Sequence, residues 1–356
     1  MLRDAKVEYL AWARRAQTTP RTVSLLYSGL NTPLDRIPFE LADLERAVPP
    51  AYDDALLLEG LSKRYGVPVT EVFPALGTSQ GIFLALATLV KPGDAVLVER
   101  PGYQPFREVS RALGASVRFF DRVPEDRYAV NPERVLREWQ PGISAVVIAD
   151  LHNPTGAMTG EEPLRELARE LESRGAMLLI DEVYRDFRPG VLGTARRLGP
   201  NVVTMSSFTK VYGLGNLRAG WILGPASVMA RLREMVDVFE SIGPTPAQAF
   251  FRRSFEIVDG LREEALARAA AGWEVVERWA NAETRVSVSK PAGGIIAWVR
   301  LPEGRTGSDV AQQLATDHDV AVVPGRFFDD DSGVRIGFGG DPATTRRGLE
   351  ALSRVL

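Results

Sequence analysis

The stretch SSFTKVYGLGNLRAGWILG, residues 206–224, follows the apolar run 201–205 and places Lys210 at the start of a glycine-rich loop. A lysine at the point where a strand gives way to such a loop can direct its amine into a cleft. Ser207 lies three residues before Lys210 and Arg218 eight residues after it, and a hydroxyl and a guanidinium can converge on a phosphate. An isolated loop lysine is more often simply solvated. The prediction of an amine beside a bound phosphate therefore needs support from other segments of the chain.

The composition is that of a large globular chain. Of its 356 residues, 45% are hydrophobic and 25% are charged, which is enough for a large core and a second domain. The lack of cysteine excludes disulfides, thiolate metal sites and cysteine catalysis. Only two histidines are present, so we expect no metal. The net charge of −3 indicates no nucleic-acid partner.

Nothing in the sequence indicates a membrane. The N-terminal residues mix charges and lack the apolar stretch of a signal peptide. No later stretch approaches the roughly 20 apolar residues of a membrane span. We therefore expect a cytoplasmic protein without a membrane partner.

Strands and helices alternate along the middle of the chain, residues 45–240. The apolar runs predicted as strands are 95–99, 116–120, 144–149 and 177–180, and a helical segment lies between each run and the next. This alternation indicates an α/β fold whose mostly parallel sheet is covered by helices on both faces. We expect a large three-layer αβα domain over this range.

The two ends of the chain, residues 1–44 and 241–356, are predicted to form a smaller α+β domain. A first helix spans 8–16, and one long helix after Pro246 continues through Trp279. The strands predicted near the C-terminus are 284–288, 293–299, 320–323 and 334–338.

Polar residues follow the predicted strands at their carboxyl ends, where ligands lie in open α/β sheets. They are Tyr103, Asn153 and the pair Asp181 and Tyr184. Tyr103 offers an aromatic face to a ligand. A carboxylate at Asp181 would favour the charged form of a neighbouring cation, although an Asp at a strand end is more often a helix cap.

A second candidate phosphate site begins at Gly77. The run Gly77-Thr78-Ser79-Gln80-Gly81 opens an apolar helix. Small residues at a helix start leave N–H groups free and expose the positive end of the helix dipole. Thr78 and Ser79 are therefore predicted to cradle a phosphate, and an ordinary capped helix is the alternative.

Four motifs occur in a recognisable order and spacing. They are Asn153-Pro-Thr-Gly, Asp181-x-x-Tyr184, Ser207-x-x-Lys210 followed by Arg218-x-Gly-Trp, and Val334-Arg335-Ile-Gly-Phe. In these motifs the chain resembles the pyridoxal phosphate (PLP) dependent enzymes of fold type I, in particular the class I and II aminotransferases. The resemblance runs from Gly29 to Arg335 and is most specific between Asn153 and Trp221.

The resemblance implies a role for each candidate residue. Lys210 carries PLP as an imine and moves the substrate Cα proton, first as a base and then as an acid. Asp181 pairs with the ring nitrogen, and Tyr103 stacks on the ring. Asn153 and Tyr184 bind the phenolic oxygen. The residues that hold the cofactor phosphate are Thr78, Ser79, Ser207 and Arg218.

Further implied roles concern the substrate and a second subunit. Arg335, with Asn153 beside it, binds the substrate α-carboxylate, and Arg326 is a nearby competitor for that role. Gly29 lines the substrate pocket, although a plain turn glycine is equally consistent with the composition. Tyr52 either packs in the core or reaches the cofactor phosphate of the other subunit of a homodimer.

The resemblance implies an aminotransferase that moves an amino group between an L-amino acid and a 2-oxo acid through pyridoxamine phosphate. A β-elimination lyase or an amino-acid cyclase on the same fold would use the same residues, and the side-chain preference stays open. The alternative outside enzymes is a PLP-binding regulatory domain fused to a DNA-binding segment. No helix-turn-helix with a basic face precedes the fold here, which argues against it.

Overall fold

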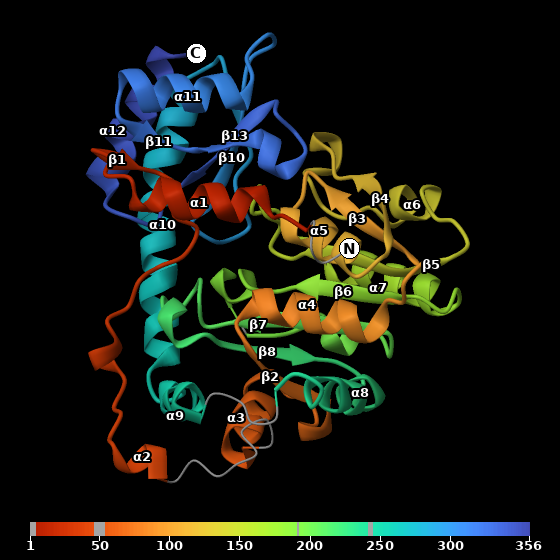
Figure 1. The fold of residues 1–356 in the computed structure, drawn as a ribbon. Helices are drawn as coiled ribbons and strands as arrows, with labels where there is room; N and C mark the ends of the chain where they lie inside the picture. The colour runs from red at the N-terminus through yellow and green to blue at the C-terminus, as the bar shows by residue number, and fades with distance from the viewer. Residues whose placement is uncertain (1–4, 46–53, 191, 241–244) are drawn as a thin grey trace.

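Seven strands form the central sheet of the larger part of the molecule (Figure 1). The computed structural model describes residues 5–45, 54–190, 192–240 and 245–356. The strands are β2 (Val72–Leu76), β3 (Ala95–Arg100), β4 (Ser116–Asp121), β5 (Ile143–Ala149), β6 (Met177–Asp181), β7 (Val202–Ser207) and β8 (Ala219–Leu223). Their order is β2-β8-β7-β6-β5-β3-β4, and β8 runs antiparallel to both of its neighbours. The predicted mostly parallel α/β sheet is confirmed.

Helices cover both faces of this sheet (Figure 1). The helices on one face are α4 (Thr78–Leu89), α5 (Gln104–Ala112) and α8 (Ala226–Val236), and those on the other are α6 (Pro132–Arg137) and α7 (Glu161–Glu172). Both faces are buried, so the strands are apolar on both sides, and every residue of β5 except Ser144 is buried. The predicted three-layer αβα arrangement is confirmed.

Both ends of the chain contribute to the smaller part of the molecule. Its antiparallel sheet has the order β12-β13-β10-β9, formed by β9 (Ser287–Val288), β10 (Ile296–Arg300), β12 (Val323–Pro324) and β13 (Gly333–Gly337). The helices of this part are α10 (Val258–Ala282), α11 (Gly307–Asp317) and α12 (Pro342–Arg354). From the N-terminus, β1 (Val23–Ser24) pairs in parallel with β11 (Val320–Ala321), and α1 (Glu8–Thr18) packs through Trp12 on Phe327. The exact domain boundaries stay a prediction.

The single helix predicted after Pro246 is wrong. The structure has α9 (Thr245–Ser254) and then α10, separated by residues 255–257. At the break, the Phe255 ring contacts Phe208 and Phe251, with ring centroids 5.7 Å apart in both pairs. This aromatic packing is a tertiary contact that helical periodicity does not report. It holds α9 beside α3 (Ala55–Tyr65) and β8.

The strand predicted at 284–288 is shortened to β9. Arg285 donates to Glu283 Oε1 from its backbone N, at 3.4 Å, and from Nε, at 2.7 Å. These two bonds close a turn in the first residues of the predicted strand, so only its last two residues pair with β10.

The described helices include none that is long and apolar enough to cross a membrane. The same residues contain no group of three or more His, Asp or Glu side chains arranged to hold a metal ion. A cytoplasmic location stays a prediction.

Candidate active site

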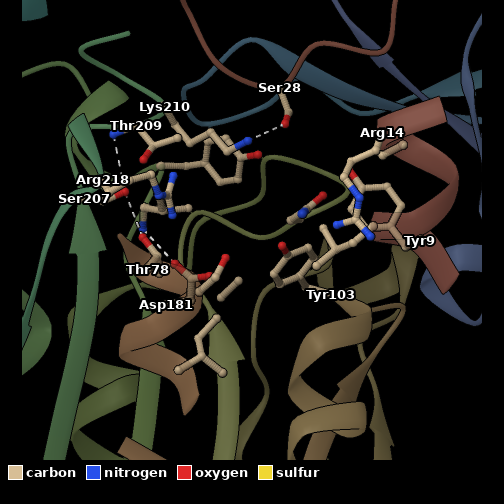
Figure 2. A pocket seen from close by; sticks show the side chains of 18 of the residues that line it. Tyr9, Arg14, Ser28, Thr78, Tyr103, Asp181, Ser207, Thr209, Lys210 and Arg218 are labelled. Carbon is tan, nitrogen blue, oxygen red and sulfur yellow. Dashed lines mark hydrogen bonds between the residues drawn. The ribbon is translucent and has the colours of Figure 1, made fainter. Parts of the chain in front are cut away.

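Residues that follow the parallel strands meet in a cavity of about 230 Å³ (Figure 2). Because β3, β5, β6 and β7 run parallel, the segments after them lie at the same edge of the sheet. The cavity brings together nine predicted site residues, Thr78, Ser79, Tyr103, Asn153, Asp181, Tyr184, Ser207, Lys210 and Arg218. Its described lining does not include Gly29 or Arg335, and Tyr52 lies outside the described residues.

Hydroxyl groups and a guanidinium gather at the start of α4. Thr78 Oγ1 donates to Ser207 Oγ at 2.9 Å, and Arg218 Nη2 donates to Leu76 O at 3.0 Å. Gly77, which precedes α4, has a φ of 78°, and a Cβ there would lie 2.5 Å from Arg218 Nη2. The positive φ favours glycine at position 77, and a Cβ there would displace the end of the Arg218 side chain. With the free N–H groups of the helix start, these donors fit a phosphate group.

Lys210 extends into the cavity from the loop after β7. Its Nζ donates to Ser28 Oγ at 2.9 Å, and burial lowers the pKa of Lys210. Gly29 packs against the stem of this lysine, because a Cβ at Gly29 would lie 2.9 Å from Lys210 Cδ. The structure thus places Gly29 behind the lysine, whereas the neighbouring Ser28 lines the cavity. Ser28 was not predicted, since no spacing in the sequence distinguishes it from Gly29.

Asp181 ends β6 and is only 4% exposed. Its Oδ1 accepts a hydrogen bond from Val183 N at 2.9 Å. Burial raises the pKa of Asp181 to about 7, opposed by this N–H and by the charge of Lys210. Among the described residues no cation lies within 4 Å of the Asp181 carboxylate. A buried carboxylate that lines a cavity and has no described cation within 4 Å fits a ligand that brings a positive charge.

Tyr184 and Tyr103 are aromatic residues of the lining, together with Tyr9. Burial raises the pKa of both phenols. For Tyr184 the charge of Arg335 and a hydrogen bond with Ser28 oppose this shift. Tyr103 makes an edge contact with Tyr9, with ring centroids 6.0 Å apart. Both phenols are therefore neutral at ordinary pH and act as hydrogen-bonding or packing groups.

Arg335 on β13 lies directly behind the lining. Its side chain is buried, and Nη1 donates to Asn153 Oδ1 at 3.0 Å while Nη2 donates to the Tyr9 hydroxyl at 3.0 Å. Its Nε is buried and has no partner among the described residues. Arg326, the predicted competitor, is exposed and lies over the Phe327 ring, outside the described lining. The geometry therefore favours Arg335 as the carboxylate-binding residue.

Helix α1 forms a wall of the cavity that sequence analysis did not predict. The backbone N of Tyr9 donates to Gln104 Oε1 at 2.6 Å, which fixes the start of α1 on α5. Its lining residues are Tyr9, Leu10, Ala13, Arg14 and Gln17. The sequence marks this segment only as an amphipathic helix, because its contacts are with residues far along the chain.

A buried ion pair supports the loop that carries Asn153. Arg122 Nη1 donates to Glu99 Oε2 at 2.7 Å and to Ala149 O at 3.0 Å, and Ala149 N donates to Glu99 Oε1 at 2.8 Å. Both charged side chains are fully buried. His152 Nε2 lies 2.8 Å from Pro101 O, and burial together with Arg122 holds the pKa of His152 well below its ordinary value. The pair fixes the end of β5, and so the position of Asn153.

Comparisons with known proteins agree with this site. The family model for aminotransferase class I and II matches residues 40–352. Capreomycidine synthase from Streptomyces vinaceus is 30% identical over 285 residues, which cover 79% of this chain and 73% of that protein. The aspartate/prephenate aminotransferase of Thermus thermophilus is 26% identical over 323 residues, covering 84% and 80%. The crystal structure of the PLP-dependent cyclase OrfR has a TM-score of 0.86 at 26% identity, covering 98% and 96%. The chain belongs to the aminotransferase class I and II family, whose members use pyridoxal phosphate.

Proposed function

We propose that this protein is an aminotransferase that transfers the amino group of an L-amino acid to a 2-oxo acid. The observation that carries the proposal is the position of Lys210 Nζ. It lies in the cavity and is hydrogen-bonded, among the described residues, to Ser28 Oγ alone. An amine in this position, with a pKa lowered by burial, can take a proton from one carbon and return it to another.

The residues present fit pyridoxal phosphate. We assign its phosphate to the hydroxyl and guanidinium groups at the start of α4, and its ring nitrogen to the Asp181 carboxylate. Asn153 and Tyr184 bind the phenolic oxygen, and Tyr103 packs on the ring. When bound, the cofactor withdraws electrons from the substrate Cα and so makes the Cα hydrogen acidic.

The protein residues then act on the proton and on the substrate carboxylate. Lys210 Nζ removes the Cα proton and delivers it to the cofactor carbon. Arg335 binds the α-carboxylate through charge-assisted hydrogen bonds. Asp181 holds the proton on the ring nitrogen, because a carboxylate beside a cation favours the charged form of both. Tyr9 covers Arg335 from the side of α1 and limits the access of water.

A second candidate is a PLP-dependent elimination or cyclisation. The observation in its favour is the similarity to capreomycidine synthase and to the cyclase OrfR. The same lysine would remove the Cα proton, but a group on the substrate Cβ would then leave. The described site residues are equally compatible with this outcome.

A half-reaction separates the two candidates. The loaded protein is mixed with single L-amino acids, including β-substituted ones, without any 2-oxo acid. An aminotransferase releases one equivalent of 2-oxo acid per site, retains the amino group on the cofactor and stops. Continued turnover with release of ammonia or of a cyclic amino acid would instead establish the second candidate.

We also propose a homodimer in which a partner subunit completes each site. Among the described residues, the four most exposed large apolar side chains are Leu41 at 80%, Leu56 at 61%, Val238 at 85% and Phe239 at 55%. Leu41 and Leu56 flank, along the chain, the segment that carries Tyr52. Burial of such side chains against a second subunit would stabilise the assembly.

A further inference from the structure

A second cavity, of about 460 Å³, lies at the C-terminal end of α3, and we call it the basic cavity. Its described lining contains seven lysine and arginine residues but only two carboxylates, Glu161 and Asp186. The described linings of the basic cavity and of the active-site cavity share no residue. The reaction proposed at Lys210 therefore gives the basic cavity no role.

The cations of the basic cavity come from segments far apart in the sequence. Charges that follow one another on one exposed helix face are ordinarily solvated. Here the fold brings guanidinium groups from separate elements to one hollow, where their mutual repulsion favours an anion among them. They are Arg64 of α3, Arg165 of α7, Arg185 of the short helix η6 (Arg185–Phe187), Arg188 directly after it, and Arg262 of α10.

Arg64 is the most enclosed donor that faces a weak counter-charge. Its side chain is only 8% exposed, and its Nη1 donates to Asp259 at 2.7 Å. The Asp259 side chain is exposed, so water screens its charge. The buried Nε of Arg64 has no partner among the described residues. Arg185, in contrast, is buried against Asp150 and Glu182, and its charge is neutralised within the protein.

Arg188 and Arg262 have no carboxylate partner in the described part of the chain. No carboxylate oxygen there lies within 4 Å of either guanidinium, and both residues are half-buried. Arg262 Nε donates to Asp186 O at 2.9 Å and Nη2 donates to Arg188 O at 2.6 Å, bonds that hold the guanidinium in place without neutralising it. The two acids of the lining do not replace an anion, because Glu161 is exposed and the Asp186 carboxylate accepts hydrogen bonds from two tyrosine hydroxyls.

Hydrogen bonds connect the basic cavity to the loop that carries Lys210. Arg64 Nη2 donates to the Tyr212 hydroxyl at 2.8 Å, and that hydroxyl donates to Asp186 Oδ2 at 2.5 Å. Arg64 and Asp186 both line the cavity, and Tyr212 lies two residues after Lys210. An anion that binds Arg64 therefore acts on a residue that holds the lysine loop.

We propose that the basic cavity binds a small polyanion of the phosphate class, at a site separate from that of the cofactor phosphate, and that the bound anion stabilises the Lys210 loop. Guanidinium groups bind phosphate oxygens through paired charge-assisted hydrogen bonds. Because Arg64, Arg188 and Arg262 come from three elements, a ligand with more than one anionic group can bind them together. The site is independent of the reaction type proposed above.

The test uses the PLP-loaded enzyme, because the bound cofactor then occupies the phosphate donors at the start of α4. Pyrophosphate is titrated by calorimetry in 0.15 M salt, where the screening length is about 8 Å and exposed charges interact weakly. We expect saturable binding of one pyrophosphate per chain. Arg335→Ala should bind it as the wild-type enzyme does, whereas loss of binding in that variant would place the anion in the active-site cavity and overturn the inference.

Two matched variants assign the binding to the basic cavity. Arg188→Gln should weaken it about tenfold, the scale of one hydrogen bond to a charged group. The Arg188 side chain makes no hydrogen bond or ion pair with the described residues, so this change should leave the fold intact. Arg169→Gln removes the same charge from an exposed position of α7 outside the described lining, and it should keep the wild-type affinity. Equal affinities in the two variants, or no saturable binding, would overturn the site.

Hydrogen exchange tests the connection to the lysine loop. Pyrophosphate should slow amide exchange in residues 208–214 of the wild-type enzyme. Tyr212→Phe, which keeps the ring but loses the hydrogen bonds to Arg64 and Asp186, should bind pyrophosphate without this slowing. Exchange that is unchanged by pyrophosphate in the wild-type enzyme would overturn the proposed effect on the loop.

Discussion

Arg335 Nη2 donates a hydrogen bond to the Tyr9 hydroxyl at 3.0 Å, although the two residues lie 326 positions apart in the chain. The Arg335 guanidinium also lies 5.7 Å from the centre of the Tyr9 ring. A substrate carboxylate that binds Arg335 has to share or replace this phenol. Occupancy of the carboxylate site and the position of α1 are therefore coupled.

Arg335→Ala should raise KM and lower kcat/KM for every α-amino acid, whatever its side chain. The expected loss is about 2–5 kcal/mol of transition-state stabilisation, typical of truncating one partner of a buried charge pair. Steady-state kinetics with acidic and neutral donors measure it. Arg326→Ala is the matched control and should change little, because that arginine is exposed and is not among the described residues that line the cavity. A loss confined to acidic donors would show that Arg335 binds a side-chain carboxylate.

Lys210 should be the residue that PLP modifies. Borohydride reduction of the loaded protein followed by peptide mapping is expected to find the cofactor on Lys210. The other four lysines, Lys6, Lys63, Lys91 and Lys290, are built-in controls outside the described lining. Lys210→Ala should lose the covalent link and keep noncovalent binding, because the phosphate and ring contacts come from other residues. A label on another lysine would contradict the site.

Asp181→Asn should lower kcat by about a hundredfold or more, because the ring nitrogen loses the carboxylate that keeps it charged. The fold should be retained. The Asn side-chain oxygen can still accept the hydrogen bond from Val183 N, and no packing volume is removed. A variant with near-normal kcat would show that Asp181 only caps the turn after β6.

The same substitution should change the pH dependence of stability in the cofactor-free protein. The pKa of Asp181 is raised from 3.8 to about 7, so the folded state keeps a proton that the unfolded state loses near pH 4. The contribution of Asp181 to the free energy of unfolding should therefore decrease between about pH 4 and pH 7 and then level off. Asn at this position does not titrate. Urea unfolding across this range should show the variant gaining on the wild-type protein as pH rises.

Gly77→Ala should weaken cofactor binding. The new Cβ would lie 2.5 Å from Arg218 Nη2 and displace a donor assigned to the phosphate. Gly93→Ala is the matched control, because Gly93 also has a positive φ, 95°, but a Cβ there meets nothing within 4 Å. Both variants should lose about 1–3 kcal/mol of stability from backbone strain, while only Gly77→Ala should raise the Kd for PLP. Equal Kd values for PLP in the two variants would argue against a phosphate site at the start of α4.

The active protein should be a homodimer. Light scattering after size-exclusion chromatography should give twice the mass of the chain, and Tyr52→Phe should weaken cofactor binding if that phenol reaches the partner's phosphate. Dilution should cause activity and dimer to disappear together. A monomer that retains full activity would contradict the shared site.

Much of the site was predictable because it is local in sequence. Asn153, Asp181 and Lys210 each follow an apolar strand, and parallel strands bring such positions together without any knowledge of distant contacts. The contributions of α1 were not predictable in this way. Tyr9 reaches Arg335 and Gln104 only after the two ends of the chain have packed, and amphipathic periodicity does not reveal the partner of a helix face.

The two errors in the predicted secondary structure have the same origin. The prediction runs one helix through residues 255–257, whereas in the structure Phe255 packs against Phe208 and Phe251 at the break between α9 and α10. At Glu283, a side chain competes with strand pairing through its bonds to Arg285. In both places a specific contact outweighed the local pattern.

The buried pair Glu99 and Arg122 has a consequence for sequence variation. Replacing either residue alone would leave an unpaired charge in the interior, at a cost of about 3–5 kcal/mol, and would release the end of β5. Replacing both with apolar residues of similar volume would avoid that cost. We expect these two positions, 23 apart in the chain, to covary among homologues, with single changes depleted and paired changes tolerated.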